Sequence, residues 1–228
     1  MELVSYRLSY RGRPVGNYSL ATTMQGSLVL LEAKMMLQGS LGTTTIQQSS
    51  KTHRNYFYSI NFQELTNGPG QNRKYTVKYD KNNGLIKASR SANDKSEIAA
   101  ISPFVDPIGL LYQVRHLDQT KKRFIIPMIG KNVIIEKITQ LEIDTALGKK
   151  LSNVYKIHPG KNLLYVDTEK PHYILAMTQF IGNKFLDSFI VKTETLKDKK
   201  RRPNKGRRRP RRRFPKSKRV NKAHTKAS

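Results

Sequence analysis

The sequence predicts a mainly β fold: a single curved antiparallel sheet or partly open barrel, covered by one short helix and followed by a disordered basic C-terminal tail. Three observations support this prediction. Short segments of alternating apolar and polar residues fill most of residues 1–196. Residues 106–115 change to the spacing of a helix. The last 32 of the 228 residues contain seventeen Lys or Arg and one acid.

The strand prediction rests on a period of two residues. In residues 3–12, Val4, Tyr6, Leu8 and Tyr10 share one face, and the positions between them are mostly polar. Gly, Asn or Pro separates the later segments of this kind, and together they predict about ten strands. The later segments are 17–26, 27–39, 43–53, 55–65, 73–91, 122–130, 131–144, 149–160, 162–182 and 183–194, with a loop at 66–72 and a hairpin turn at 81–84.

The helix prediction rests on a start signal and on a change of spacing. Asp106 followed by Pro107 is the pair of N-cap and first helical residue that begins many helices. Apolar residues then recur at helical spacing, and an arginine continues the same face. A sheet this long would curl, and the helix gives its apolar face something to pack on. The helical face consists of Ile108, Leu111, Tyr112 and Arg115.

Composition divides the chain into a β domain at 1–196 and the tail at 197–228. The tail carries +16 of the chain's net charge of +27, so the preceding residues carry +11. Phe214 and Val220 are the tail's only large apolar residues, so it cannot bury a core, and we expect it to be disordered. The chain has no cysteine, which excludes disulfides, thiolate metal sites and a cysteine nucleophile.

The N-terminal residues lack the charged start and unbroken apolar run of a signal peptide. No stretch approaches the roughly 20 apolar residues that a membrane-spanning helix requires. We therefore expect a cytoplasmic protein, associated with the nucleoid or with ribosomes through its basic tail.

The second half of the chain contains an ordered set of motifs. An Asp-Pro opens the short helix, which ends near an arginine, and a strand ending in Asp, a Pro and a Gly turn follow. With the opening hairpin YRLSYRGRPVGNYSL, this order resembles the bacterial DUF3108 family over about residues 4–192. The matching positions are Asp106, Pro107, Leu111, Tyr112, Arg115, Gly148, Asp167, Pro171 and Gly182.

The DUF3108 resemblance implies a long curved sheet around a helix, similar to the half-barrels of lipoprotein carriers. It implies no established chemistry. Most members of that family carry an export signal. This chain lacks that pattern and adds the basic tail, so the resemblance does not by itself imply an envelope role.

The residue types that carry catalysis form no convincing constellation. No two of the five histidines stand at metal-ligand spacing, and we interpret them as capping or turn residues. Glu142 and Asp144 share a strand face and would suit an acid/base pair, but in so basic a chain we favour partners for Lys or Arg. Phosphate-binding and nucleophile motifs are absent. We therefore expect no enzyme, no cofactor and no metal site. The histidines are His53, His116, His158, His172 and His224.

Arg115 admits two interpretations, because it continues the apolar face of the helix. It forms a buried ion pair with an acid such as Asp106 or Asp167, or it is the polar anchor of a concave pocket. The ion pair is the simpler of the two.

The tail is the strongest candidate site. Arginine grips phosphate with two N–H groups, and three prolines keep the segment extended. We expect it to bind DNA or RNA through the phosphates with little sequence preference. An anionic membrane is the weaker alternative, because no amphipathic helix or lipidation motif accompanies the tail. The predicted binding residues are Lys199, Lys200, Arg201, Arg202, Lys205, Arg207, Arg208, Arg209, Arg211, Arg212, Arg213, Lys216, Lys218 and Arg219.

Two functions follow. The first is a non-enzymatic nucleic-acid-binding protein that takes most of its affinity from the tail. Arg interleaved with Tyr and Phe in YRLSYRGR and HRNYFYS adds to it, although Tyr6 and Tyr10 belong to the predicted core. The alternative is a carrier-like module that binds a small apolar ligand in its concave sheet, with the tail docking on an anionic surface. A deep apolar cavity with Arg115 at its mouth would favour this alternative, and a concave side filled by side chains would favour the first function.

Overall fold

A computed structural model describes residues 1–228 except 40–41, 81, 91–94, 100–102, 182–183 and 197–228. The tail that is predicted to be disordered, and the nucleic-acid-binding residues predicted within it, therefore lie outside the described residues. The described residues belong to one compact unit.

The described residues form one helix and fourteen strands, which join in a single sheet. The fold prediction of a mainly β protein with one helix is confirmed. The elements are β1 (Glu2–Tyr10), β2 (Arg13–Gln25), β3 (Leu28–Leu37), β4 (Thr44–His53), β5 (Ser59–Gly68), β6 (Gln71–Asp80), β7 (Leu85–Ser89), β8 (Lys95–Ala99), α1 (Pro107–Val114), β9 (Arg123–Met128), β10 (Lys131–Thr145), β11 (Gly148–His158), β12 (Asn162–Asp167), β13 (Ile174–Ile181) and β14 (Lys184–Thr195).

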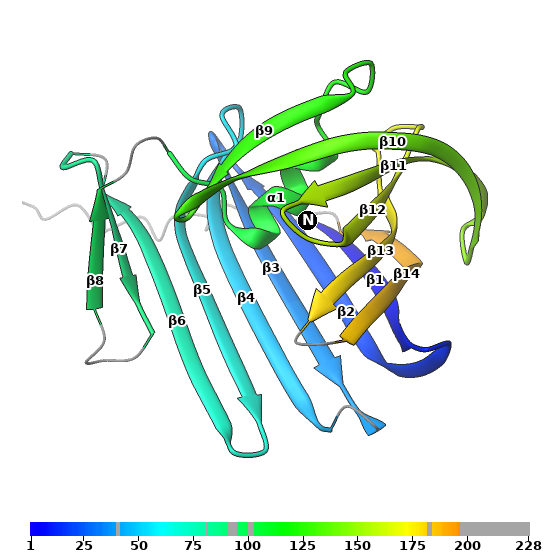
Figure 1. The fold of residues 1–228 in the computed structure, drawn as a ribbon, viewed down its shortest axis with the longest axis horizontal. Coiled ribbons are helices and arrows are strands. Elements are labelled where there is room, and N and C mark those ends of the chain that lie inside the picture. The colour runs from blue at the N-terminus through cyan, green and yellow to red at the C-terminus, as the bar shows by residue number, and fades with distance from the viewer. Residues whose placement is uncertain (40–41, 81, 91–94, 100–102, 182–183, 197–228) are drawn as a thin grey trace, which may run out of the picture. The chain divides into compact units, whose positions relative to one another are not determined.

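The chain starts in the middle of the sheet. From β1 it passes strand by strand to β8 at one edge, crosses through α1 to β9 at the other edge, and returns to β14 beside β1. All neighbouring strands are antiparallel, and Met1 and Leu196 exchange backbone hydrogen bonds of 3.0 and 2.8 Å. The sheet is not closed, and its two halves curl around α1, which lies between them (Figure 1).

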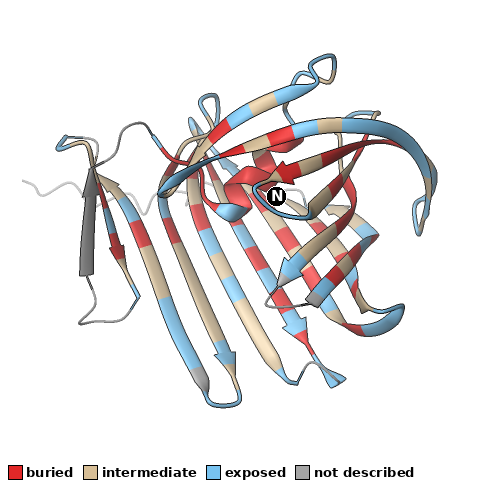
Figure 2. Cartoon of the chain, viewed as in Figure 1, coloured by how far each residue is buried: buried red, intermediate tan, exposed pale blue. Residues whose placement is uncertain are grey.

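Alternation places the core as the sequence predicts. Val4, Tyr6 and Leu8 in β1 are all buried, and Tyr10 packs partly against the same core. Buried positions recur along the strands as stripes (Figure 2). One apolar cluster joins both halves of the sheet to the buried face of α1. The helix therefore packs its buried residues against the apolar face of the curled sheet, as predicted.

The start of α1 confirms the predicted cap. Asp106 is the N-cap, its carboxylate accepts a hydrogen bond of 2.8 Å from the Gly109 N–H, and Pro107 occupies the first turn. The cap satisfies one of the free N–H groups at the helix start. Arg115 follows as the C-cap residue.

Several element boundaries differ from the sequence prediction, and the predicted strand segment 162–182 divides into β12 and β13. The segment 55–65 begins as a turn, and β5 starts only at Ser59, because Phe57 adopts a left-handed backbone with φ 57° and packs its ring against Tyr112 and His116. The predicted loop at 66–72 shrinks to Pro69 and Gly70, since β5 and β6 extend up to them. The sequence also missed β8.

Candidate functional site

The concave side of the sheet holds an open cavity beside α1, which we call the α1 cavity. It encloses about 460 Å³, within the range of small-molecule sites. Most of its lining is apolar and comes from both halves of the sheet and from the start of the helix. The lining residues are Tyr18, Met35, Ile46, Gln48, Glu64, Pro107, Ile108, Leu110, Leu111, Met128, Lys131, Val133, Ile157, Pro159, Asn162, Leu164 and Gln179.

Few polar groups face the α1 cavity, and they are placed by neighbouring strands. Gln48 donates a hydrogen bond of 2.7 Å to the Glu64 carboxylate across the β4–β5 pair. Asn162 accepts one of 2.7 Å from the Phe180 N–H. The side-chain oxygen of Gln179 is buried without a hydrogen-bond partner among the described residues. The cavity thus combines an apolar wall with a few polar groups that can orient a ligand.

A second, more polar depression adjoins the α1 cavity, and we call it the arginine hollow. It encloses about 770 Å³ and shares Glu64 with the α1 cavity. Arg73 and Arg90 are exposed at its surface, and Tyr75 follows Arg73 by two residues on the same face of β6. The lining residues are Glu64, Thr66, Arg73, Lys74, Tyr75 and Arg90.

A buried polar cluster fixes α1 against the sheet. The Asp106 carboxylate accepts a hydrogen bond from the Ser50 hydroxyl of β4, and the Asp106 N–H donates one of 2.8 Å to the Ser59 hydroxyl of β5. Asp106 is fully buried, and this burial raises the pKa of its carboxyl above the ordinary value, although the hydrogen bonds it accepts act in the opposite direction. The cluster is satisfied internally, so its role is to position the helix that lines the α1 cavity.

Arg115 forms a buried ion pair, but with an acid that the sequence did not indicate. Its guanidinium donates two hydrogen bonds, of 2.6 and 3.1 Å, to the carboxylate of Glu2 in β1. It also lies over the Tyr173 ring, with the guanidinium carbon 5.0 Å from the ring centroid. The predicted partners Asp106 and Asp167 are therefore wrong. Arg115 is not among the residues that line the α1 cavity, so the structure gives no support to its role as a pocket anchor.

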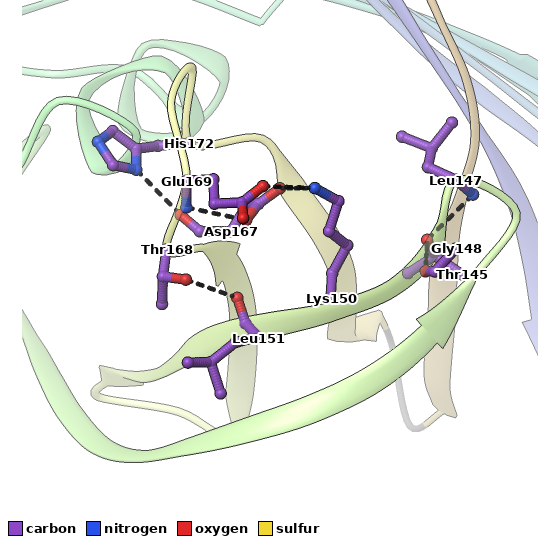
Figure 3. Close-up of polar contacts among 9 residues, drawn as sticks. All are labelled: Thr145, Leu147, Gly148, Lys150, Leu151, Asp167, Thr168, Glu169 and His172. Atoms are coloured by element: carbon purple, nitrogen blue, oxygen red, sulfur yellow. Dashed lines mark hydrogen bonds and ion pairs between the residues drawn. The ribbon is translucent and has the colours of Figure 1, made fainter.

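A polar cluster at the turn between β12 and β13 contains several residues that the sequence singled out (Figure 3). Lys150 lies 2.6 Å from the Glu169 carboxylate and 3.8 Å from that of Asp167. His172 contacts the Asp167 carbonyl oxygen at 3.0 Å, which makes it a turn residue. These contacts tie the β12–β13 turn to β11.

Three more histidines occupy the capping or turn positions that the sequence predicts. The His53 ring accepts hydrogen bonds from two N–H groups of its own turn, His116 contacts the Tyr112 carbonyl at the end of α1, and His158 ends β11 beside Glu136. Burial lowers the pKa of His116 below its ordinary value. His224 lies outside the described residues.

The acids Glu142 and Asp144 show the expected pairing in part. Glu142 forms an exposed ion pair of 2.7 Å with Lys149, and Asp144 stands opposite Lys149 in the strand register. Within the described ranges, no group of three or more His, Cys, Asp or Glu is arranged to hold a metal ion.

The turn between β4 and β5 presents a stack of aromatic rings, which we call the aromatic turn (53–58). Tyr56 is 74% exposed, and its ring stacks near those of His53 and Tyr58 at centroid distances of 4.8 and 6.5 Å. Arg54 is exposed beside it. Because Phe57 turns inward against the helix, its neighbour Tyr56 is directed to the surface.

Sequence reasoning missed Glu2 and most of the α1 cavity. Glu2 pairs with a residue 113 positions away, and no local pattern indicates that contact. The cavity residues carry the apolar signal of any core strand, so periodicity marks them as buried without showing that space remains beside them.

A single meandering sheet curled around one helix, with an open apolar cavity between them, defines this protein as an open β half-barrel. The chain belongs to the DUF3108 family, described as a protein of unknown function, whose profile matches residues 5–141. The match ends within β10, and the remaining strands continue the same sheet.

A solved structure with a similar fold is a crystal structure of a β-barrel-like protein of the domain of unknown function DUF1849 from Brucella abortus. It is 8% identical in sequence, the alignment covers 85% of this chain and 96% of that chain, and the TM-score is 0.56. At this identity the likeness concerns the fold alone. No curated protein matches the chain. Among the described residues, no helix is long and apolar enough to cross a membrane.

Proposed function

We propose that this chain is a non-enzymatic binding protein that holds a small apolar ligand in the α1 cavity. The observation that carries the proposal is the cavity itself, about 460 Å³ of open space lined mainly by apolar side chains on the concave face. An apolar ligand that covers this surface removes it from water, and this removal favours binding. The open cavity meets one of the two conditions that favour a carrier-like module, although Arg115 is not at its mouth.

The test is to fill the cavity. Ile46 lines it, and Ile46→Trp would place an indole where the ligand is expected. An apolar fluorescent probe should bind the full chain, and Ile46→Trp should weaken that binding by about tenfold or more, since the ligand would lose contact with the wall. Ile125→Trp is the matched control, because Ile125 is 65% exposed and outside the cavity lining. Equal binding by both variants would contradict the proposal.

Nucleic-acid binding through the tail is the second candidate function, and the charge of the chain favours it. Seventeen cations in 32 residues are far more than solubility requires, and phosphates are the abundant intracellular polyanions. The exposed Tyr56 and Arg54 of the aromatic turn supply a surface on which an unpaired base can stack. The two candidates use different residues and are compatible in one protein.

Fluorescence anisotropy across a salt series tests this second function. The full chain should bind duplex DNA, single-stranded DNA and structured RNA. If about eight phosphates are neutralised, the logarithm of the binding constant should fall with the logarithm of salt concentration at a slope near −7 on duplex DNA. A chain ending at Leu196 should lose most of this affinity. Absence of binding by the full chain near physiological salt would contradict it, and anionic vesicles would then be the next probe.

A further inference from the structure

We infer that the ligand is an amphipathic anion, with its apolar body in the α1 cavity and its negatively charged headgroup at Arg73 and Arg90 in the arginine hollow. The inference rests on the proposed function, because it assumes that the α1 cavity holds an apolar ligand. It adds the chemical class of the headgroup and the residues that recognise it.

The two depressions are neighbours on the sheet. Glu64 lines both of them, so they meet at its side chain. In the strand register, Tyr75 stands opposite Glu64 and Arg73 opposite Thr66. Alternation puts these side chains on the same face of the sheet as the buried Phe62 and Val77, which is the concave face. A ligand that fills the cavity can therefore extend along the concave face to the arginines.

The charges give the site a direction. The arginine hollow is lined by three cations, Arg73, Lys74 and Arg90, whereas the α1 cavity is lined by one, Lys131, and the acid Glu64 lines both. The Glu64 carboxylate already accepts the hydrogen bond from Gln48 and stands at the boundary with the apolar cavity. A negative headgroup is repelled from that boundary and attracted to the exposed guanidinium groups beyond it. Guanidinium groups also match carboxylate and phosphate oxygens with paired N–H donors.

The experiment compares two ligands that differ only in the headgroup, dodecanoate and dodecan-1-ol, by displacement of the apolar probe. Both the full chain and a chain ending at Leu196 are used, since the tail attracts anions by itself and Met1–Lys197 is a compact unit. Both chains should bind dodecanoate more tightly than dodecan-1-ol. The double variant Arg73→Gln/Arg90→Gln should lower the affinity for dodecanoate by about tenfold and leave the affinity for dodecan-1-ol unchanged. This is the effect expected when a charge-assisted hydrogen-bonded pair is removed.

Two further variants locate the headgroup. Lys78→Gln removes one positive charge from the outer face of β6 and should change neither affinity, because Lys78 lies outside the lining of both depressions. Glu64→Gln should raise the affinity for dodecanoate severalfold, since it removes the carboxylate that repels the headgroup.

If the wild-type chain binds both ligands equally, or if the double arginine variant lowers both affinities to the same extent, the inference about the headgroup is overturned and the proposed function is not. If neither ligand displaces the probe from the wild-type chain, the inference falls together with the proposed function.

Discussion

Single residues decide how α1 is held, and Asp106 is the first of them. Its buried carboxylate caps the helix and contacts hydroxyl groups from β4 and β5. Asp106→Ala should lower the free energy of unfolding by about 2–4 kcal/mol, through loss of the cap and of buried hydrogen bonds. Urea unfolding at pH 7 measures this, and a loss below about 0.5 kcal/mol would show that the cluster does not fix the helix.

The same carboxyl predicts a pH dependence. Burial raises the pKa of Asp106 in the folded state above its ordinary value of 3.8. The neutral form is therefore favoured by folding, and its contribution to stability is complete below pH 3.8 and is lost as pH rises through the folded-state pKa. Asp106→Asn does not titrate and serves as the reference. The unfolding free energy of the wild type minus that of the variant should fall as pH rises above 3.8 and then become constant. A flat difference would contradict the raised pKa.

The Glu2–Arg115 pair makes a different prediction, because removal of one partner leaves the other charge buried. Arg115 is 5% exposed. Glu2→Leu alone should lower the free energy of unfolding by about 2–4 kcal/mol. This loss is smaller than for a fully buried pair because the Glu2 side chain is 22% exposed. Glu2→Leu/Arg115→Met should recover at least about half of that loss, since no charge then remains unpaired. Urea unfolding of the wild type, both single variants and the double variant gives the coupling energy, and simple additivity would show that the pair does not interact.

Among the elements, the aromatic turn makes a prediction about nucleic acids. Tyr56 is the most exposed large hydrophobic residue described and stands beside Arg54. If unpaired bases stack on it, Tyr56→Ala should weaken single-stranded DNA binding by about 1 kcal/mol or more and leave duplex DNA nearly unchanged. Ile125→Ala is the control, because Ile125 is a similarly exposed apolar residue in β9, far from this turn in sequence. Equal losses for both forms of DNA would rule out base stacking.

Elements are also the scale at which the sequence predicted the structure best. Alternation in 3–12 and the Asp106-Pro107 start of the helix both appear as predicted, because they depend on local spacing and capping. The start of β5 was wrong for a physical reason. Phe57 gains a buried contact with Tyr112 and His116 by leaving the extended backbone, and that tertiary contact outweighs the local strand pattern.

At the scale of the whole molecule, the arrangement of strands was beyond the sequence. Nothing local in β1 indicates that it pairs with β14, or that the crossing through α1 leads to the opposite edge of the sheet. The α1 cavity depends on this arrangement, since its walls come from both halves of the sheet. The tail, in contrast, is evident from composition alone, because charge needs no fold to be recognised.

The two candidate binding functions should therefore be separable. The α1 cavity lies entirely within residues 1–196, and the densest positive charge lies in 197–228. A chain ending at Leu196 should keep its affinity for the apolar probe within about twofold and lose most of its affinity for DNA, because the lining is intact and most of the phosphate contacts are gone. Ile46→Trp in the full chain should lose most of its affinity for the apolar probe and keep its affinity for DNA. Titration of both variants with both partners checks this, and parallel loss of the two affinities would mean that one depends on the other.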